Sequence, residues 1–394
     1  MISIGIHEQP EGRIYPLALY FLAWFEAQLG NFLSSAATLK EAAAASPDYC
    51  FPNQIEAVMV LEWAKNQNST DPRAPYYLGN FWYNARQYED AIANWELSIS
   101  RDDSFPTVHR NLALAYFNKS KDPERALAEL EKAFSLNPFD ARILMELDQL
   151  YKRLNYSAAS RLEILDKYPE LVEFRDDLFL EKITLLNLLG QHQEAYQLIM
   201  SRKFHPWEGG EGKVTGQYVI SLVEIAIKAI KNQEFAQAID FLNLAQQYPE
   251  NLGEGKLFGA AENQIHFWLG CAFDGIGNQA KAKEHWRRAS EGISEPMPAI
   301  FYNDQQPDTI YFQGLALCKL GSYEEARKRF ETLIQFGKDH LEDQFKLDYF
   351  AVSLPDLQIW EDDLTKRNRQ NCIHLIELGE KGIKNIHFDK VSEL

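Results

Sequence analysis

The chain has 394 residues, 46% of them hydrophobic and 25% charged, as is typical of a soluble protein with a substantial core. Its 57 acidic and 40 basic side chains give a formal net charge of −17, which opposes binding to nucleic-acid phosphates and to anionic lipids. The four cysteines form no Cys-x-x-Cys pair, and no apolar run reaches the roughly 20 residues of a membrane span. We therefore expect a cytoplasmic protein with reduced, buried thiols and with neither nucleic-acid nor membrane partners.

The amino-terminal half is predicted to consist of helical hairpins. Residues 1–13 form a flexible lead-in without the basic start or apolar centre of a secretion signal. A first hairpin turns at Gly30-Asn31, and an additional amphipathic helix follows over 53–65, with Asn53 as its expected N-cap. Two further hairpins span 75–101 and 107–138, and the turn of the latter carries one extra residue.

The carboxy-terminal half continues this pattern and contains its clearest copy. A fourth hairpin begins at Ala141 and has a degenerate second helix near 157–167, and four more hairpins follow. The clearest copy is 263–292, which is predicted to form two amphipathic helices around a turn at Gly277-Asn278. Residues 339–394 are less regular and are expected to form a helical cap, with a helix that breaks before Pro355 and a final helix over 368–384.

The spacing of apolar and small residues in 263–292 resembles the tetratricopeptide repeat. Leu269-Gly270, Phe273 and Trp286 match the pattern W-x2-L-G-x2-Y…A-x3-F, and His266 occupies the position of the first aromatic residue. Small residues such as Gly270 allow the two helices to approach closely. The resemblance implies an all-α, right-handed α-solenoid of about eight such hairpins over 14–338, with 339–394 as a continuous cap.

The repeats lengthen in the second half. The small residue of each second helix recurs at steps of 35, 34 and 35, and then of 43, 44 and 44, at Ala91, Ala126, Ser160, Ala195, Ala238, Ala282 and Ala326. The added residues follow the second helix each time, which places enlarged loops at 203–218, 248–259 and 295–308. Such loops project from one edge of a solenoid, and we expect this edge to be a working surface.

The loop edge carries a first set of candidate binding residues. Gly-Glu-Gly-Lys occurs in both of the first two loops, and aromatic, acidic and amide side chains surround it. The candidates are His205, Trp207, Glu208, Glu211, Lys213, Glu250, Asn251, Glu254, Lys256, Tyr302, Asn303 and Asp304. An aromatic face with a polar rim suits a sugar, and paired carboxylates also occur in glycosidases. The alternative is that the glycines supply positive φ and that the glutamates cap the following helices.

The inner groove carries a second set. Tetratricopeptide proteins that bind a peptide's terminal carboxylate use Lys, Asn, Asn, Lys and Arg at five groove positions. Asn80, Asn111 and Arg142 fall on three of them, whereas Tyr76 and Glu146 stand where Lys and Arg would be needed. The carboxylate of Glu146 would repel such a ligand, so binding of another kind of peptide in the groove stays open.

Catalytic and cofactor motifs are not recognised in the sequence. The histidines show no His-x-x-x-His spacing, which argues against a metal site, and His109 and His266 are expected to be packing residues. Neither a Gly-rich phosphate loop nor Gly-x-Ser-x-Gly is present. We therefore expect no catalytic residue, no metal and no cofactor.

Several specific strings resemble one family across 14–376: large bacterial proteins of unassigned function in which a mutarotase-like β-sandwich precedes a tetratricopeptide half. The matching strings are PDYCFPN, APYYLGN, FHPWEGGEGK, YPENLGEGKL, YNDQ and DYFAVSLPD. The resemblance implies a carbohydrate-related setting in which the loop edge faces the sandwich or a ligand held against it. Because this chain begins near the expected junction, we expect it to be the helical half alone or the product of a split gene.

Two functional hypotheses follow. The first is a non-enzymatic scaffold that binds a protein or peptide partner, such as a separately encoded mutarotase-like sandwich, through the groove and the loop edge. The second is a carbohydrate-binding or carbohydrate-active subunit whose sugar site the three loops complete together with that partner.

Overall fold

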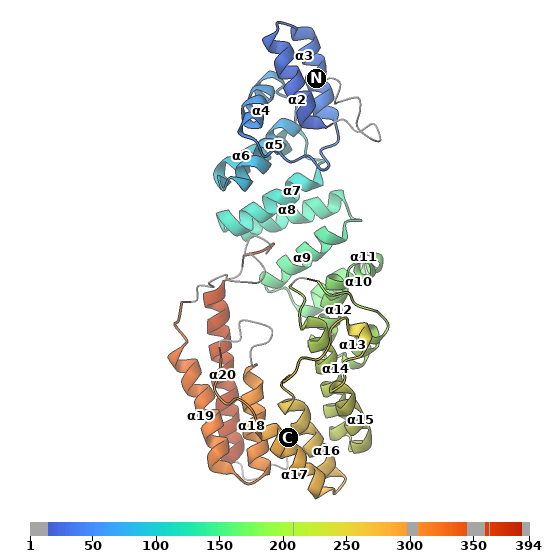
Figure 1. Ribbon diagram of the computed structural model, residues 1–394, viewed down its shortest axis with the longest axis vertical. Helices are drawn as coiled ribbons and strands as arrows, with labels where there is room; N and C mark the ends of the chain where they lie inside the picture. Colours follow the sequence, from blue (N-terminus) through green and yellow to red (C-terminus); the bar gives the residue numbers. More distant parts are fainter. Residues whose placement is uncertain (1–14, 208, 298–305, 345–358, 362, 388–394) are drawn as a thin grey trace. The chain divides into compact units, whose positions relative to one another are not determined.

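The computed structural model describes residues 15–207, 209–297, 306–344, 359–361 and 363–387. Within these residues every regular element is a helix (Figure 1). The chain divides into two compact units, residues 1–155 and 156–394. Each unit is built of consecutive helical hairpins, so the predicted all-α solenoid of tetratricopeptide-like repeats is confirmed as a fold class.

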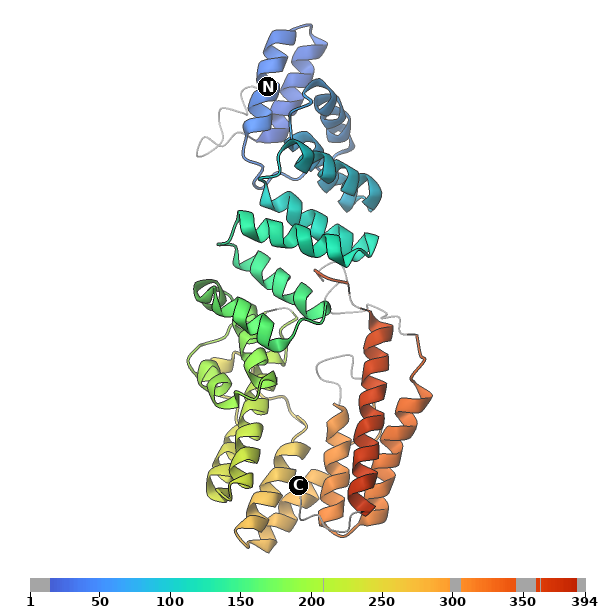
Figure 2. The ribbon, with the colours of Figure 1, turned by 180° about the vertical axis from the view of Figure 1, so that it is seen from behind.

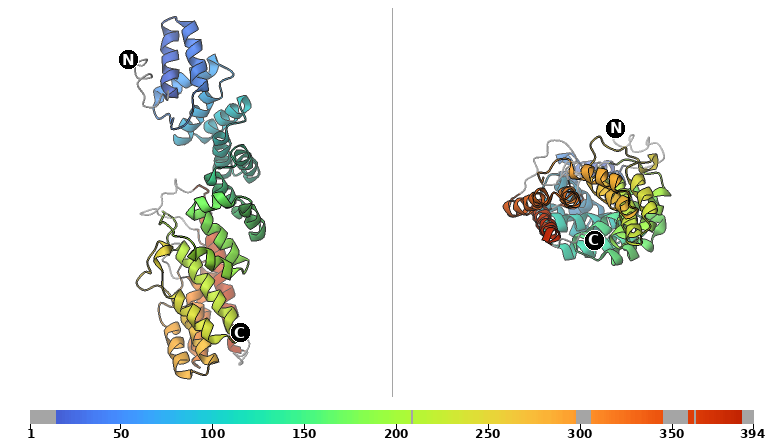
Figure 3. Two further views of the ribbon diagram at one scale, coloured as in Figure 1. Left: turned by 90° about the vertical axis from the view of Figure 1, so that its right-hand side faces the viewer. Right: turned by 90° about the horizontal axis from the view of Figure 1, so that it is seen from below.

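The first unit contains three hairpins, an intervening helix and a final helix. The hairpins pair α2 with α3, α5 with α6, and α7 with α8, while α4 contacts both α2 and α5. Figure 3 shows α2 and α3 lying side by side. The helices are α2 (Pro16–Gln28), α3 (Phe32–Ala44), α4 (Ile55–Gln67), α5 (Arg73–Asn84), α6 (Tyr88–Arg101), α7 (Pro106–Ala115), α8 (Pro123–Leu136) and α9 (Ala141–Arg153).

The second unit repeats the arrangement with longer connections. Its first helices contact one another in the order α12, α14, α16, α18 and α20, and each of the first four also packs on its own second helix. The helices are α10 (Ala158–Asp166), α11 (Pro169–Phe174), α12 (Asp176–Leu188), α13 (His192–Met200), α14 (Lys213–Lys231), α15 (Phe235–Ala245), the short 3₁₀ helix η3 (Glu250–Leu252), α16 (Asn263–Gly275), α17 (Gln279–Ser290), α18 (Pro307–Lys319), α19 (Tyr323–Asp339) and α20 (Leu364–His387).

The two helices of a hairpin pack closely where a glycine of the first helix contacts a large aromatic ring of the second. A Cβ atom on the glycine would overlap the ring in three hairpins, at Gly79 with Trp95, Gly270 with Trp286, and Gly314 with Phe330. In each case the ring follows the glycine by the same 16 positions, so one notch-and-ring contact recurs along the chain. Because the rings are buried, they fix the spacing of the two helices.

The extra residue predicted in the third hairpin is absorbed without opening the hairpin. The end of α7 continues as a π-helical turn, η2 (Tyr116–Ser120), in which one residue is added to the helical ladder. Lys121 then adopts the left-handed conformation, with φ of 55°, and the N–H of Asp122 donates to the carbonyl of Tyr116 at 2.9 Å. The side chain of Asp122 caps α8 by accepting from the N–H of Arg125.

The last helix packs as the first helix of another repeat. α20 is longer than the predicted 368–384 and lies along both α18 and α19 (Figure 2). Gly379 and Gly382 allow it to approach α19, since a Cβ atom at either would overlap atoms of Ile334 or Phe330. The extent of the 14–338 domain stays a prediction. The lead-in and residues 345–358, which include the helix break expected before Pro355, lie outside the described residues.

Two local predictions are corrected. The helix expected from Asn53 begins at Ile55, and its N-cap position is Gln54, whose side chain makes no capping hydrogen bond. The cysteines are free thiols as expected, but Cys271 is only partly buried, unlike Cys50, Cys318 and Cys372. Among the described helices, none has both the length and the apolarity needed to span a membrane.

Candidate functional site

The first two enlarged loops contact each other. The backbone N–H of Phe204 in the first loop donates to the carbonyl of Asn251 in the second, at 2.8 Å. The Asn251 amide donates in return to the carbonyls of Ile199 and Arg202, at 2.9 and 3.0 Å. Gly253 has φ of 77°, and a Cβ atom there would lie 2.7 Å from the carbonyl oxygen of Phe204. The loops therefore form one interlocked surface, here called the loop platform (residues 201–207, 209–212 and 248–262).

Glu254 connects the second loop to α14, the helix that follows the first loop. Its Oε2 accepts from the N–H of Gly212 at 2.9 Å, and Gly212 is the N-cap of α14. A carboxylate at a helix N-terminus also interacts favourably with the macrodipole. Lys256 is similarly engaged, by the Glu262 carboxylate at 2.5 Å and by the carbonyl of Gln246 at 3.1 Å. Thus Asn251, Glu254 and Lys256 hold the platform together. Glu254 caps α14, the helix after the first loop, whereas the capping interpretation placed each glutamate at the helix that follows its own loop.

His205 is positioned by Asp176, in the first turn of α12. Both the backbone N–H and Nδ1 of His205 contact Oδ2 of Asp176, at 2.9 and 3.1 Å. Burial raises the pKa of Asp176, but these contacts and the Arg202 guanidinium lower it overall below its ordinary value. The carboxylate therefore stays charged and orients the imidazole, whose side chain remains 79% exposed. His205 is therefore a predicted site residue that this platform leaves exposed.

The other loop candidates have different surroundings. Trp207 is half-buried, and its ring lies against Gly210, where a Cβ atom would overlap it. Glu211 is half-buried, whereas Lys213, the first residue of α14, and Glu250, the first residue of η3, are exposed. The platform also exposes Leu257 and Phe258, which the sequence interpretation did not single out. The remaining candidates lie outside the described residues: Glu208, Tyr302, Asn303 and Asp304.

The groove candidates lie on the first helices of the first unit. Asn111 of α7 donates through Nδ2 to Oδ1 of Asn80 of α5, at 3.2 Å, and the same oxygen accepts from the Trp95 indole at 3.1 Å. Both asparagines are half-buried. Tyr76 is only 5% exposed, and its ring packs edge-on against Phe105. Asn80 and Asn111 therefore form one hydrogen-bonded polar pair. The Tyr76 ring packs in the interior instead.

Glu146 of α9 changes the electrostatics expected in this groove. Its side chain is fully buried, and Arg110 of α7 binds it with two hydrogen bonds, at 2.6 and 2.5 Å. Arg142 adds a third at 2.9 Å while its side chain stays 59% exposed. Two guanidinium groups and one carboxylate leave a formal charge of +1. The expected repulsion by Glu146 is thus offset, and part of the Arg142 side chain stays exposed.

Two residues with a clear role were missed at the sequence level. Arg110 neighbours Asn111 and lies 36 positions before Glu146, close to one repeat length, so the repeat register offered a signal for this pair. For Asp176 the only sequence signal was its position in the first turn of α12. That signal is weak, because acidic residues are common in the first turn of any helix.

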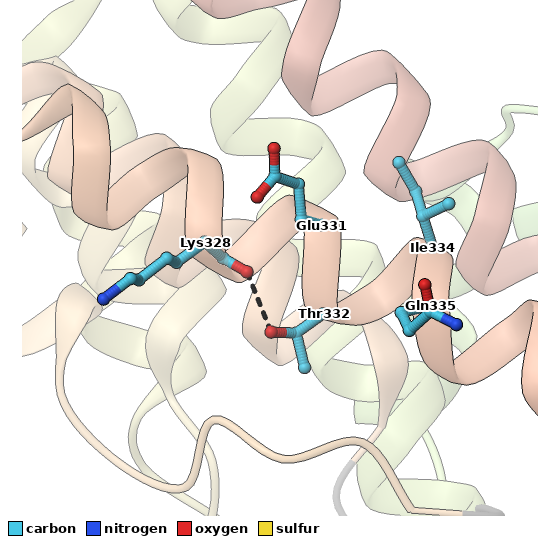
Figure 4. A pocket seen from close by; sticks show the side chains of 5 residues that line it. All are labelled: Lys328, Glu331, Thr332, Ile334 and Gln335. Atoms are coloured by element: carbon cyan, nitrogen blue, oxygen red, sulfur yellow. Dashed lines mark hydrogen bonds between the residues drawn. The ribbon is translucent and has the colours of Figure 1, made fainter.

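A shallow hollow on α19 does not contribute to either surface. It is lined by Lys328, Glu331, Thr332, Ile334 and Gln335, all from this one helix (Figure 4). The Thr332 hydroxyl donates to the Lys328 carbonyl at 2.8 Å within the helix. Side chains of a single helix cannot converge on a ligand from several sides, so we assign no function to it.

Comparison with known proteins gives distant likenesses. The chain matches no protein-family model. It is similar to YrrB, described as a tetratricopeptide protein with an unusual peptide-binding site (15% identity, 58% of this chain, 97% of that one, TM-score 0.35). It is also similar to a tetratricopeptide repeat protein from Parabacteroides merdae, with 13% identity over 77% of this chain and 99% of that one and a TM-score of 0.35. A chain of Naa15/Naa10 bound to HypK-THB is similar as well, with 9% identity over 94% of this chain and 58% of that one and a TM-score of 0.43. At these values the likenesses support no conclusion about function.

Proposed function

We propose that the chain is a non-enzymatic scaffold whose first-unit groove binds a protein or peptide through a carboxylate. The observation that carries this proposal is the row of polar side chains on α5, α7 and α9: the paired amides of Asn80 and Asn111, followed by the exposed part of Arg142. Amide and guanidinium N–H groups are good donors to a carboxylate. The net positive charge around Glu146 attracts an anion in a chain whose total charge is −17.

A peptide panel tests the proposal. Fluorescent peptides that differ only in a free or an amidated C-terminus would be titrated with the full chain and followed by anisotropy. Peptides with the free carboxylate should bind more tightly, and Asn111→Ala or Arg142→Gln should weaken that binding about 10-fold, as expected for loss of one hydrogen bond to a charged group. Asn84→Ala is the matched control, because Asn84 lies on the same helix as Asn80 but is exposed at its end.

Two results would contradict it. If amidation leaves the affinity unchanged, the groove does not recognise a terminal carboxylate. If Asn84→Ala weakens binding as much as Asn111→Ala, the peptide lies elsewhere on the molecule.

The loop platform is proposed as a second surface for a protein partner, with the mutarotase-like sandwich as the candidate that the sequence resemblance suggests. The exposed Leu257 and Phe258 support a contact of this kind, since exposed apolar side chains on a fixed loop are typical of interaction sites. The sugar hypothesis for Trp207 remains open. A panel of mono- and oligosaccharides that leaves the melting temperature unchanged would count against it, and a shift abolished by Trp207→Ala would favour it.

A further inference from the structure

Two histidines meet between the helices of the α16–α17 hairpin. Nδ1 of His266 lies 3.2 Å from Nδ1 of His285, and the ring centroids are 5.3 Å apart with 36° between the ring planes. Both residues are partly exposed. The two residues are 19 positions apart in sequence, a separation that no metal-binding spacing rule would have selected.

The separation of the two nitrogens fits a shared metal ion. Two imidazole nitrogens bound to one tetrahedral zinc at about 2.0–2.1 Å lie about 3.3 Å from each other. In the structure the two Nδ1 atoms lie 3.2 Å apart, within reach of a direct N–H···N hydrogen bond and close to this separation. We propose that His266 and His285 bind one divalent transition-metal ion of the zinc class through Nδ1, with water completing the coordination, and so clamp α16 to α17.

The His285 ring is oriented by its neighbour Phe273. His285 stacks on Phe273 at 5.2 Å with 8° between the planes, and Lys281 lies over the same Phe273 ring at 5.0 Å, which restricts rotation of His285.

Charged neighbours of the two histidines limit the affinity for a metal cation. Lys256 and Arg288 oppose a cation, although each is paired, with Glu262 at 2.5 Å and with Glu284 at 2.7 Å. Among the described residues, no third histidine, cysteine or carboxylate joins the two histidines as a ready ligand group. We therefore expect an open site of moderate affinity, which Arg288→Gln should tighten by removing one positive charge.

Titration of the full chain with Zn²⁺ tests the proposal by calorimetry, and Cu²⁺ electron paramagnetic resonance reports the number of bound nitrogens. We expect one saturable site and a melting temperature that rises with Zn²⁺ and falls back with a chelator. His266→Phe, which keeps an aromatic ring at this repeat position, and His285→Gln should each abolish both effects. His340→Gln should not, because His340 lies on another helix end and pairs with Asp343.

The outcomes separate clearly. Binding that survives His266→Phe and His285→Gln, or the absence of saturable binding below about 1 mM, would overturn the proposal. Because a substitution at His266 can itself loosen the hairpin, Arg288→Gln provides a test with both histidines intact: tighter Zn²⁺ binding supports the site, and unchanged binding argues that the ion is bound elsewhere.

Discussion

The notch at Gly270 supports a prediction in which the same substitution has opposite effects at two positions. A Cβ atom at Gly270 would overlap the five-membered ring of Trp286 and lie 2.9 Å from its Cε2. Trp286 is only 4% exposed, so its ring cannot move aside into solvent. At Gly216, in the first turns of α14, an added Cβ atom would meet nothing within 4 Å. Both glycines lie in helices of the second unit.

The expected changes in the free energy of unfolding follow from two contributions, helix propensity and overpacking. Replacing glycine by alanine inside a helix stabilises by about 1 kcal/mol, because alanine loses less backbone entropy on folding. At Gly270, overpacking costs about 1–3 kcal/mol and offsets or exceeds this gain. We expect Gly216→Ala to stabilise the second unit by about 1 kcal/mol, and Gly270→Ala to be less stable than Gly216→Ala by about 1–3 kcal/mol.

Urea unfolding followed by circular dichroism measures both free energies, and a Trp286→Leu background shows whether the ring causes the difference. In that background Gly270→Ala should behave like Gly216→Ala, because the overlap has been removed. If Gly270→Ala is as stable as Gly216→Ala in the unmodified chain, the notch does not set the helix spacing and the reasoning is wrong.

Three further predictions concern charged groups. His109 contacts a carboxylate of Glu129 at 2.6 Å and the Asp103 carbonyl at 2.8 Å; burial acts to lower its pKa, but these bonds raise it overall. The folded state should therefore lose stability as pH rises from about 6.5 through the raised pKa, and Glu129→Gln should remove this dependence in pH-resolved unfolding. Glu254→Ala should cost about 1 kcal/mol and increase hydrogen exchange at Gly212, whereas unchanged exchange would show that the cap is not needed. Glu146→Ala should destabilise the first unit by about 3 kcal/mol, and full stability in urea would contradict the importance of its ion pairs.

Local pattern was sufficient for the hairpins. The predicted helices around Gly277-Asn278 are observed as α16 and α17, because apolar spacing, a glycine at φ of 78° and an asparagine cap act within a few residues. The same pattern was not sufficient at the start of α4, where Asn53 was expected to cap the helix. Capping depends on the local backbone, and the helix begins two residues later, at Ile55.

Contacts between repeats were less predictable. The shared Gly-Glu-Gly-Lys string indicated that the first two loops have related geometry, and these loops do contact each other. It did not indicate that Glu254 would cap α14, since that bond joins residues 42 positions apart. For the same reason the sequence suggested that Glu146 would repel an anion, whereas Arg110, from another helix, pairs with it.

By itself, the order of apolar, small and turn-forming residues determined that this chain forms helical hairpins and where most of them turn. Helix formation and close helix packing depend on neighbours a few positions apart, which a sequence shows directly. Only the tertiary structure decided which polar side chains bind each other and which stay exposed. The pairing of Glu146 with Arg110, the capping by Glu254 and the meeting of His266 with His285 each depend on distances between separate helices or loops, and those distances are fixed by packing.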